Sequence, residues 1–448
     1  MFPVNRSNSM TRSFAKFMNR IRRPSPALLI AIVLGLLGIG AGAVFGWARY
    51  HLWAAERALK NYDFDQAHGE LQLYVKVRSG DADVHLLAAQ IARRCDAYDE
   101  AEKHLREAFQ QSGMTEGFAL ERSLLSAQQG NFEAVERSLW GRTGPDYPEA
   151  VLVLEALAKG YANHNRQAQT LFCLNLLLER DPNHPYALLA RARAWEDRAA
   201  HGEKDRDEDA LRDFEKAVEL RPTFDARFGL AGALYRVGRV RDALSQYEQL
   251  HQLRPAQIEV VLGLARCRYS LHEVQESKRL LQEVLDAQPD HAGALLELGR
   301  ALLHEGQLGE AESLLRRAVT YSPPYQTEPL RVLCRCLEAE KKPEESRQFT
   351  DELERREAAV IDVERLTAQA GREPLNVSLR YDIALKLIAL GREEDGIAAL
   401  KSVLDLDPRH VPANERLANY FEKLGQTDRA AQYHRAAALA DDANLGNK

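Results

Sequence analysis

The 448-residue sequence has few of the residues that cross-link a chain, bind metals or stack as aromatic rings. Aromatic residues make up 7% of the chain, and its five cysteines have no spacing typical of disulfides or zinc sites. Cys334 and Cys336 form a lone CxC pair inside a segment that is expected to be helical. No convincing run of alternating apolar and polar residues is present, so essentially no sheet is predicted. We therefore expect an all-α protein without a metal or another cofactor.

Sequence motifs of the common enzyme classes are also missing. The chain contains no HExxH zinc motif, no phosphate-binding P-loop, no GxSxG elbow and no paired CxxC. His272-Glu273 and His304-Glu305 each lack a second metal ligand at a suitable spacing. The sequence therefore predicts a protein that is not an enzyme and that has no catalytic residue.

Acidic residues are absent from the first 48 positions, and this divides the charge of the chain unevenly. The whole chain has 60 basic and 66 acidic residues, for a net charge of −6. Six basic residues lie in the acid-free part: Arg6, Arg12, Lys16, Arg20, Arg22 and Arg23. The remainder thus carries 54 basic and 66 acidic residues, a net charge of −12. Such an acidic chain is a poor general binder of nucleic acid, so nucleic acid is not an expected partner.

The stretch from Ala27 to Trp47 carries no charge and is long enough to cross a hydrocarbon core. Arg22 and Arg23 precede this stretch, so the positive-inside rule places the N-terminus in the cytoplasm. The sequence predicts a single-pass membrane protein whose remaining residues lie outside the cytoplasm, in a bacterial periplasm. Residues 1–26 are then a basic cytoplasmic tail, and residues 27–47 a transmembrane signal-anchor helix.

Other interpretations of this N-terminal region stay open. Ala41-Gly42-Ala43 resembles a signal-peptidase site, and cleavage there would release a soluble exported protein. An acid-free leader with Arg and Ser is also compatible with a mitochondrial presequence. Gly38, Gly42 and Gly46 recur at every fourth position, along one helical face. This spacing allows close helix packing in a membrane and predicts a homodimer through these glycines.

The strongest pattern in the sequence is a repeat with a period of roughly 34 residues, a length typical of repeat arrays. It is marked by four prolines at nearly constant spacing: Pro222, Pro255, Pro289 and Pro323. Between them, small residues recur in two slots and large apolar residues in a third: Ala231, Ala265, Gly299; Ala243, Ser277, Ala311; Tyr247, Leu281, Leu315. The recurrence of both the prolines and the slots predicts an array of similar structural units.

Each unit of this array is predicted to be a pair of helices. Gly238 and Gly306 lie between the two helices, where a glycine can end a helix without strain. Small residues such as Gly299 allow two helix backbones to approach closely, and Pro323 cannot continue the second helix. One pair cannot bury its apolar face alone, so stacked pairs would form a solenoid with a continuous core.

These slots resemble the tetratricopeptide repeat (TPR), a helix-turn-helix unit, over about Ala48 to Ala440. The resemblance implies a right-handed α-solenoid of about ten to eleven helix pairs. The expected segments are N-terminal repeats at 48–182, central repeats at 183–323 with a charged insertion at 198–207, a degenerate repeat and a long charged helix at 324–370, C-terminal repeats at 371–440, and a tail at 441–448.

In this family, the first helix of each pair lines a concave groove that binds peptides. Slot by slot, the resemblance implies these groove residues: Phe228, Tyr235, Arg236, Arg266, Tyr269, Arg300 and His304. Arg266 and Arg300 share one slot, which predicts a basic stripe and an acidic partner segment with interspersed apolar residues. Chaperone-binding members use a Lys and Asn clamp, but this sequence has Phe228 and Gly232 in one pair of the clamp slots. A role with those chaperones is therefore disfavoured.

Taken together, these patterns predict a membrane-anchored scaffold that presents a TPR groove outside the cytoplasm. Its expected role is the assembly or regulation of an envelope complex. A soluble exported peptide-binding protein and a non-catalytic subunit of an enzyme or export complex are the alternatives. The sequence predicts a protein or peptide partner without identifying it.

Overall fold

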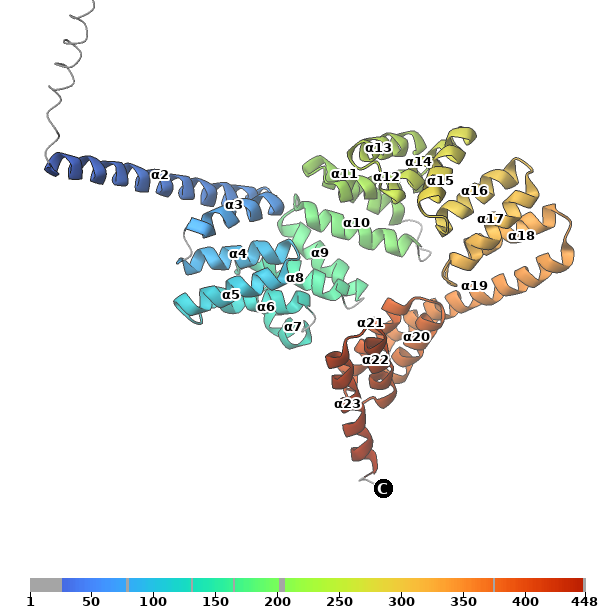
Figure 1. The fold of residues 1–448 in the computed structure, drawn as a ribbon. Coiled ribbons are helices and arrows are strands. Elements are labelled where there is room, and N and C mark those ends of the chain that lie inside the picture. Colours follow the sequence, from blue (N-terminus) through green and yellow to red (C-terminus); the bar gives the residue numbers. More distant parts are fainter. Residues whose placement is uncertain are drawn as a thin grey trace, which may run out of the picture. The chain divides into compact units, whose positions relative to one another are not determined.

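The computed structural model describes residues 26–77, 80–129, 132–163, 166–200, 206–373 and 375–445. These residues form helices α2 to α23 and no strand, which confirms the all-α prediction (Figure 1). By its internal contacts the chain divides into two compact units, residues 1–122 and 123–448. The boundary falls within α6.

In the described part of the chain, the helices follow one another as eleven pairs, from α2 and α3 to α22 and α23. We call the even-numbered member of each pair the A helix and the odd-numbered member the B helix. The first unit holds α2 (Pro26–Lys60), α3 (Phe64–Val77), α4 (Ala82–Arg94), α5 (Tyr98–Ser112) and the start of α6 (Glu116–Gln129). The second unit continues with α7 (Phe132–Trp140), α8 (Ala150–Asn163), α9 (Gln167–Arg180), α10 (Pro185–Ala200), α11 (Arg206–Leu220), α12 (Phe224–Arg236), α13 (Val240–Leu253), α14 (Ile258–Ser270), α15 (Val274–Ala287), α16 (Ala292–His304), α17 (Leu308–Tyr321), α18 (Glu328–Ala339), α19 (Pro343–Arg372), α20 (Val377–Ala389), α21 (Glu393–Leu406), α22 (Val411–Lys423) and α23 (Thr427–Leu445).

A residue in the left-handed conformation closes the turn between the A and B helices of many pairs. Gly238 and Gly306 have φ angles of 83° and 78°, as expected from their place in the repeat. His272 and Lys341 adopt the same conformation, with φ of 65° and 60°, although each carries a side chain. The turn geometry is therefore kept in repeats that lack the glycine.

Small residues on the A helices allow the pairs to pack closely. A Cβ atom at Gly299 would lie 2.8 Å from Cγ of Leu315 on the following helix, so this contact requires glycine. Leu315 and Ala318 are fully buried, as their slots predict. The central repeats share one apolar core that extends from Ala192 to Leu337. Stacking of neighbouring pairs therefore buries the faces that a single pair would leave exposed.

Two charged segments interrupt the regular period of the sequence. Of the predicted insertion at 198–207, residues 201–205 lie outside the described residues, and α11 begins at Arg206. The later charged stretch forms α19, a helix of 30 residues in which Ser346 and Val363 are buried. The second half of α19 packs through Val363 against Leu379 and Ile383 of α20.

The predicted transmembrane span, residues 27–47, falls within α2, whose side chains are described from Gly42 onward. Within the described residues, no helix combines the length and the apolar character needed to cross a bilayer. The prediction of a spanning helix therefore has no support from the described part of the chain. Gly42 and Gly46 face open space, with no other group within 4 Å of an added Cβ atom, and Gly38 lies outside the described side chains.

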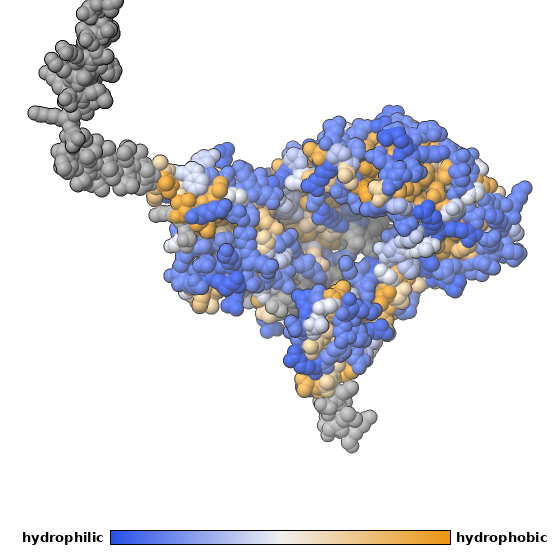
Figure 2. Space-filling model, in the orientation of Figure 1, coloured by the Kyte–Doolittle hydropathy of each residue, from blue (hydrophilic) through white to orange (hydrophobic). Residues whose placement is uncertain are grey.

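The described part of α2 carries a cluster of exposed large apolar side chains. Their exposed fractions lie between 43% and 58% for Val44, Phe45, Trp47, Tyr50 and Trp53. Figure 2 shows a hydrophobic surface where the described part of this helix begins. Other residues of the same stretch of α2 are buried, because Ala48, Ala55 and Ala58 pack into the core of the first unit.

Candidate functional site

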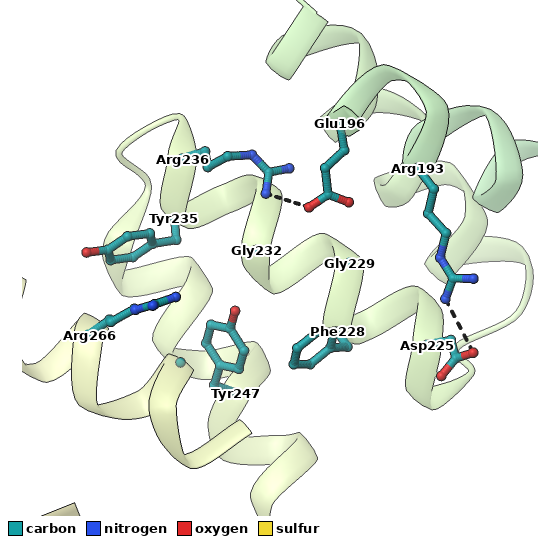
Figure 3. Close-up of a pocket in the computed structure, with 11 residues that line it drawn as sticks. Arg193, Glu196, Asp225, Phe228, Gly229, Gly232, Tyr235, Arg236, Tyr247 and Arg266 are labelled. Carbon is teal, nitrogen blue, oxygen red and sulfur yellow. Dashed lines mark hydrogen bonds and ion pairs between the residues drawn. The ribbon is translucent and has the colours of Figure 1, made fainter. Parts of the chain in front are cut away.

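A cavity of about 590 Å³ opens among the A helices of the central repeats, within the second unit. Helices α10, α12, α13 and α14 contribute its lining: Arg193, Glu196, Asp225, Phe228, Gly229, Gly232, Tyr235, Arg236, Tyr247, Gly263 and Arg266 (Figure 3). The cavity thus brings together four of the seven groove residues named from the sequence, namely Phe228, Tyr235, Arg236 and Arg266. We call it the central pocket.

Three glycines explain why the central pocket lies at this point of the array. A Cβ atom at Gly229 would lie 2.2 Å from the ring of Phe214, and one at Gly263 would lie 2.4 Å from the ring of Tyr247. Both rings belong to B helices, and each one reaches the backbone of the next A helix because no side chain intervenes. Gly232 also lines the pocket and has no side chain to fill it, so the surface of α12 is hollow at this residue.

Aromatic rings form the apolar part of the lining. Phe228 contacts Tyr247 edge to face, with 6.0 Å between the ring centroids. On its other side, Phe228 is stacked with Phe224 at 6.4 Å. Phe228 is half-buried, so the free part of its ring can cover an apolar group of a ligand.

The rim of the central pocket is charged, and its charges are compensated within the chain. Arg236 lies 2.6 Å from Glu196 and 2.8 Å from Asp207, while Arg193 lies 3.4 Å from Asp225. The lining contains three arginines and two carboxylates. The basic stripe expected from the sequence is therefore largely neutralised by carboxylates that the slot pattern did not place here.

Tyr247 is the most buried polar side chain of the lining, with 7% of its surface exposed. Burial raises the pKa of Tyr247 to about 12, so the phenol stays protonated at neutral pH and can donate a hydrogen bond. Figure 3 shows its hydroxyl directed toward α12 at Gly232. Among the described residues, this hydroxyl has no hydrogen-bond partner.

The other three predicted groove residues lie one repeat further along and do not line the central pocket. Tyr269 on α14 contacts His304 on α16 edge to face, with 6.3 Å between the ring centroids. Arg300 lies 2.9 Å from Glu328 on α18. The predicted residues therefore share the A-helix surface but divide between two places on it.

The repeat pattern does not identify several residues of the pocket, above all Tyr247, which it places in the slot of large apolar residues. Its hydroxyl reaches the pocket because Gly263 leaves room for the ring. A signal for this was present in the sequence, because Phe214 precedes Gly229 and Tyr247 precedes Gly263 at nearly the same spacing. An aromatic residue on a B helix followed by a glycine on the next A helix indicates where the A-helix surface is hollowed in these two repeats.

Family models match the region of the pocket and a second region near the C-terminus. A model described as tetratricopeptide repeat matches residues 200–258 and 262–327, and another with the same description matches residues 356–438. The chain contains tetratricopeptide repeats. No curated protein matches the chain. The central pocket thus lies mostly within recognised tetratricopeptide repeats, since α12, α13 and most of α14 fall in the first matched regions.

Several solved structures resemble parts of this chain. YrrB, described as a TPR protein with an unusual peptide-binding site, is 18% identical with a TM-score of 0.34, covering 45% of this chain and 96% of its own. PilW, described as a type IV pilus biogenesis factor, is 19% identical with a TM-score of 0.38, covering 46% and 92%. The human IFIT1 dimer with m7Gppp-AAAA is 17% identical with a TM-score of 0.38, covering 80% and 90%. At these identities the likeness concerns the helical repeat alone.

Proposed function

We propose that this protein is a non-catalytic scaffold that binds a partner protein through an extended peptide segment, and that the central pocket holds part of this segment. The observation that carries the proposal is the pocket itself. A cavity of about 590 Å³ lies on the A-helix surface of tetratricopeptide repeats, which generally serve as protein-interaction modules. Its lining combines half-buried aromatic rings with arginines, the residue types that anchor many protein interfaces.

The arrangement of the lining suits a peptide. Phe228 and Tyr247 provide an apolar wall for a side chain, while the ion pairs of Arg236 and Arg193 form a polar rim. Pockets that bind small groups usually combine a largely apolar lining with a few well-placed polar groups.

Filling the pocket tests this function directly. Gly232→Leu places a side chain over the floor, where an added Cβ atom would lie 3.6 Å from Arg236 and 3.9 Å from Tyr247, both ordinary contact distances. The substitution also replaces a glycine inside a helix, so we expect the fold to be kept. We expect the full-length variant to lose peptide binding in a selection from a displayed random-peptide library, in which the unmodified chain enriches a defined set.

Gly309→Leu is the matched control, because Gly309 lies on α17 and has no other group within 4 Å of an added Cβ atom. The control should enrich the same peptides as the unmodified chain. If Gly232→Leu enriches these peptides equally well, the central pocket is not the binding site. If the unmodified chain enriches none, the proposal of peptide binding fails.

We also propose that residues 27–47 anchor the protein in a membrane with the repeats outside the cytoplasm. The support is the uncharged sequence of this stretch, the arginines before it, and the exposed Trp47, Tyr50 and Trp53 on α2. A reporter enzyme that is active only outside the cytoplasm should be active when fused after Lys448. Activity of a cytoplasm-specific reporter at the same position would contradict this topology. Release of the mature chain from the membrane fraction would instead favour cleavage near Ala43.

A further inference from the structure

Ion pairs connect neighbouring A helices along the groove surface. Arg236 pairs with Glu196 between α12 and α10, Arg266 lies 2.9 Å from Glu297 between α14 and α16, and Arg300 pairs with Glu328 between α16 and α18. The described residues form no such pair between α12 and α14. That junction is joined instead by the hydroxyl groups of Tyr235 and Ser270, 3.2 Å apart. The row of ion pairs is therefore interrupted at the central pocket.

At this interruption, the guanidinium groups of Arg236 and Arg266 line the same pocket as the phenol of Tyr247. Arg236 on α12 and Arg266 on α14 find their carboxylate partners on helices to either side, α10 and α16. Both arginines act electrostatically on the hydroxyl of Tyr247, and the carboxylate of Glu196 acts on it in the opposite sense. In the described part of the chain, the junction between α12 and α14 thus has two arginines near it, each paired with a carboxylate on another helix, and no ion pair that crosses it.

The donors at this junction converge on one point. The position that a Cβ atom would take at Gly232 lies 3.6 Å from Nη1 of Arg236 and 3.9 Å from the hydroxyl oxygen of Tyr247. That position is empty because residue 232 is glycine. A ligand atom slightly further into the pocket can therefore approach both donors at once.

We infer that the junction between α12 and α14 is a carboxylate subsite, in which Tyr247 and Arg236 donate hydrogen bonds to an acidic side chain of the bound peptide. The inference rests on the proposed peptide-binding function and adds the chemistry of one ligand residue. Hydrogen bonds to a carboxylate from charged or buried donors are among the strong ones in proteins. The methylene groups of the acidic side chain would then lie against the ring of Phe228.

The hydroxyl of Tyr247 distinguishes this subsite from a surface cluster of arginines. It lines the pocket at the end of an otherwise buried ring, so an acceptor on a bound ligand can receive its hydrogen bond. A cationic ligand group could donate a hydrogen bond to the phenol, but the two arginines would repel it. The carboxylates of the lining, Glu196 and Asp225, already face arginines, which reduces their attraction for such a group.

Two peptide libraries on the full-length chain identify the ligand group and its source. In the first, random dodecapeptides are fused at their C-termini to the display protein, so side chains are their only carboxylates. In the second, the peptides end in a free C-terminus. We expect enrichment of one fixed Asp or Glu position in the first library. Enrichment of peptides from the second library alone would assign the subsite to a C-terminal carboxylate and contradict a side-chain carboxylate. Enrichment of Lys or Arg in place of the acidic residue would also overturn the inference.

Tyr247→Phe tests the role of the hydroxyl, because it removes one oxygen atom and keeps the ring that packs against Gly263. For a selected peptide, capped at both ends, we expect the affinity to fall about tenfold. The same peptide with Ala in place of its acidic residue has no acceptor for the hydroxyl, so it should bind the unmodified chain and the variant almost equally. Tyr321→Phe is the control, since Tyr321 is an exposed residue at the end of α17 and lies outside the pocket. An unchanged preference for the acidic peptide in Tyr247→Phe would overturn the inference.

A failure of the carboxylate subsite can be distinguished from a failure of the proposed peptide binding. If no peptide is enriched from either library, peptide binding itself fails. If peptides are enriched and their binding is lost in Gly232→Leu but shows no acidic preference, the pocket binds peptides and the carboxylate subsite is wrong.

Discussion

Glu121→Ala is expected to lower the free energy of unfolding by about 3–5 kcal/mol, because it removes one member of a buried ion pair. In the first unit, Nε of Arg93 lies 2.5 Å from Oε1 of Glu121, and Nη2 lies 3.4 Å from Oε2. The side chain of Arg93 is fully buried and Glu121 is 7% exposed. In such a setting the attraction between the charges offsets their desolvation, so removal of the carboxylate leaves the desolvation cost of the guanidinium less well compensated.

Hydrogen exchange measured by mass spectrometry on the full-length chain would locate the effect. Peptides from α4 and α6 should lose protection in Glu121→Ala, since these helices carry the pair. Glu344→Ala is the control, because Glu344 and Arg347 form an ion pair that is 80% and 75% exposed and therefore contributes little. Unchanged protection of α4 would show that other groups around Arg93 compensate its charge.

The helix pairs could be predicted from the sequence because they depend on a pattern that repeats. Prolines and small residues recur with a nearly constant period, and both the helices and the Gly299–Leu315 contact follow from that recurrence. The buried pair of Arg93 and Glu121 could not be predicted in this way. It occurs once, and its partners lie on two helices, α4 and α6, whose relative rotation the repeat pattern does not determine.

The pocket was predictable only in part for a related reason. Slot positions give the residues of the A-helix surface, so Phe228, Tyr235, Arg236 and Arg266 could be named. They do not show which acidic residues lie opposite the arginines, because those come from neighbouring repeats. The slot positions also do not show that a B-helix residue such as Tyr247 reaches this surface. That depends on the size of the residue on the next A helix, which is Gly263 here.

Gly229→Ala is the second substitution with a large expected effect. An added Cβ atom at this position would lie 2.2 Å from the ring of Phe214, which is fully buried and cannot move aside without disturbing α11. We expect a loss of about 1–3 kcal/mol in the free energy of unfolding, the usual cost of overpacking a core. Gly309→Ala is the control, because an added Cβ atom there meets no other group within 4 Å. The control should keep or slightly raise stability, since alanine favours the helix.

A second substitution separates overpacking from a backbone effect. Phe214→Leu shortens the ring side chain, so it should make room for the new methyl group while leaving a space when present alone. A later repeat already combines a leucine with a larger residue on the next helix, with Leu281 and Glu297 in the equivalent positions. We expect the double variant to be more stable than the sum of the single effects by about 0.5–3 kcal/mol, as for residues in direct contact. Strict additivity in urea unfolding would mean that the ring of Phe214 does not require glycine at position 229, and this explanation of the pocket's depth would then be wrong.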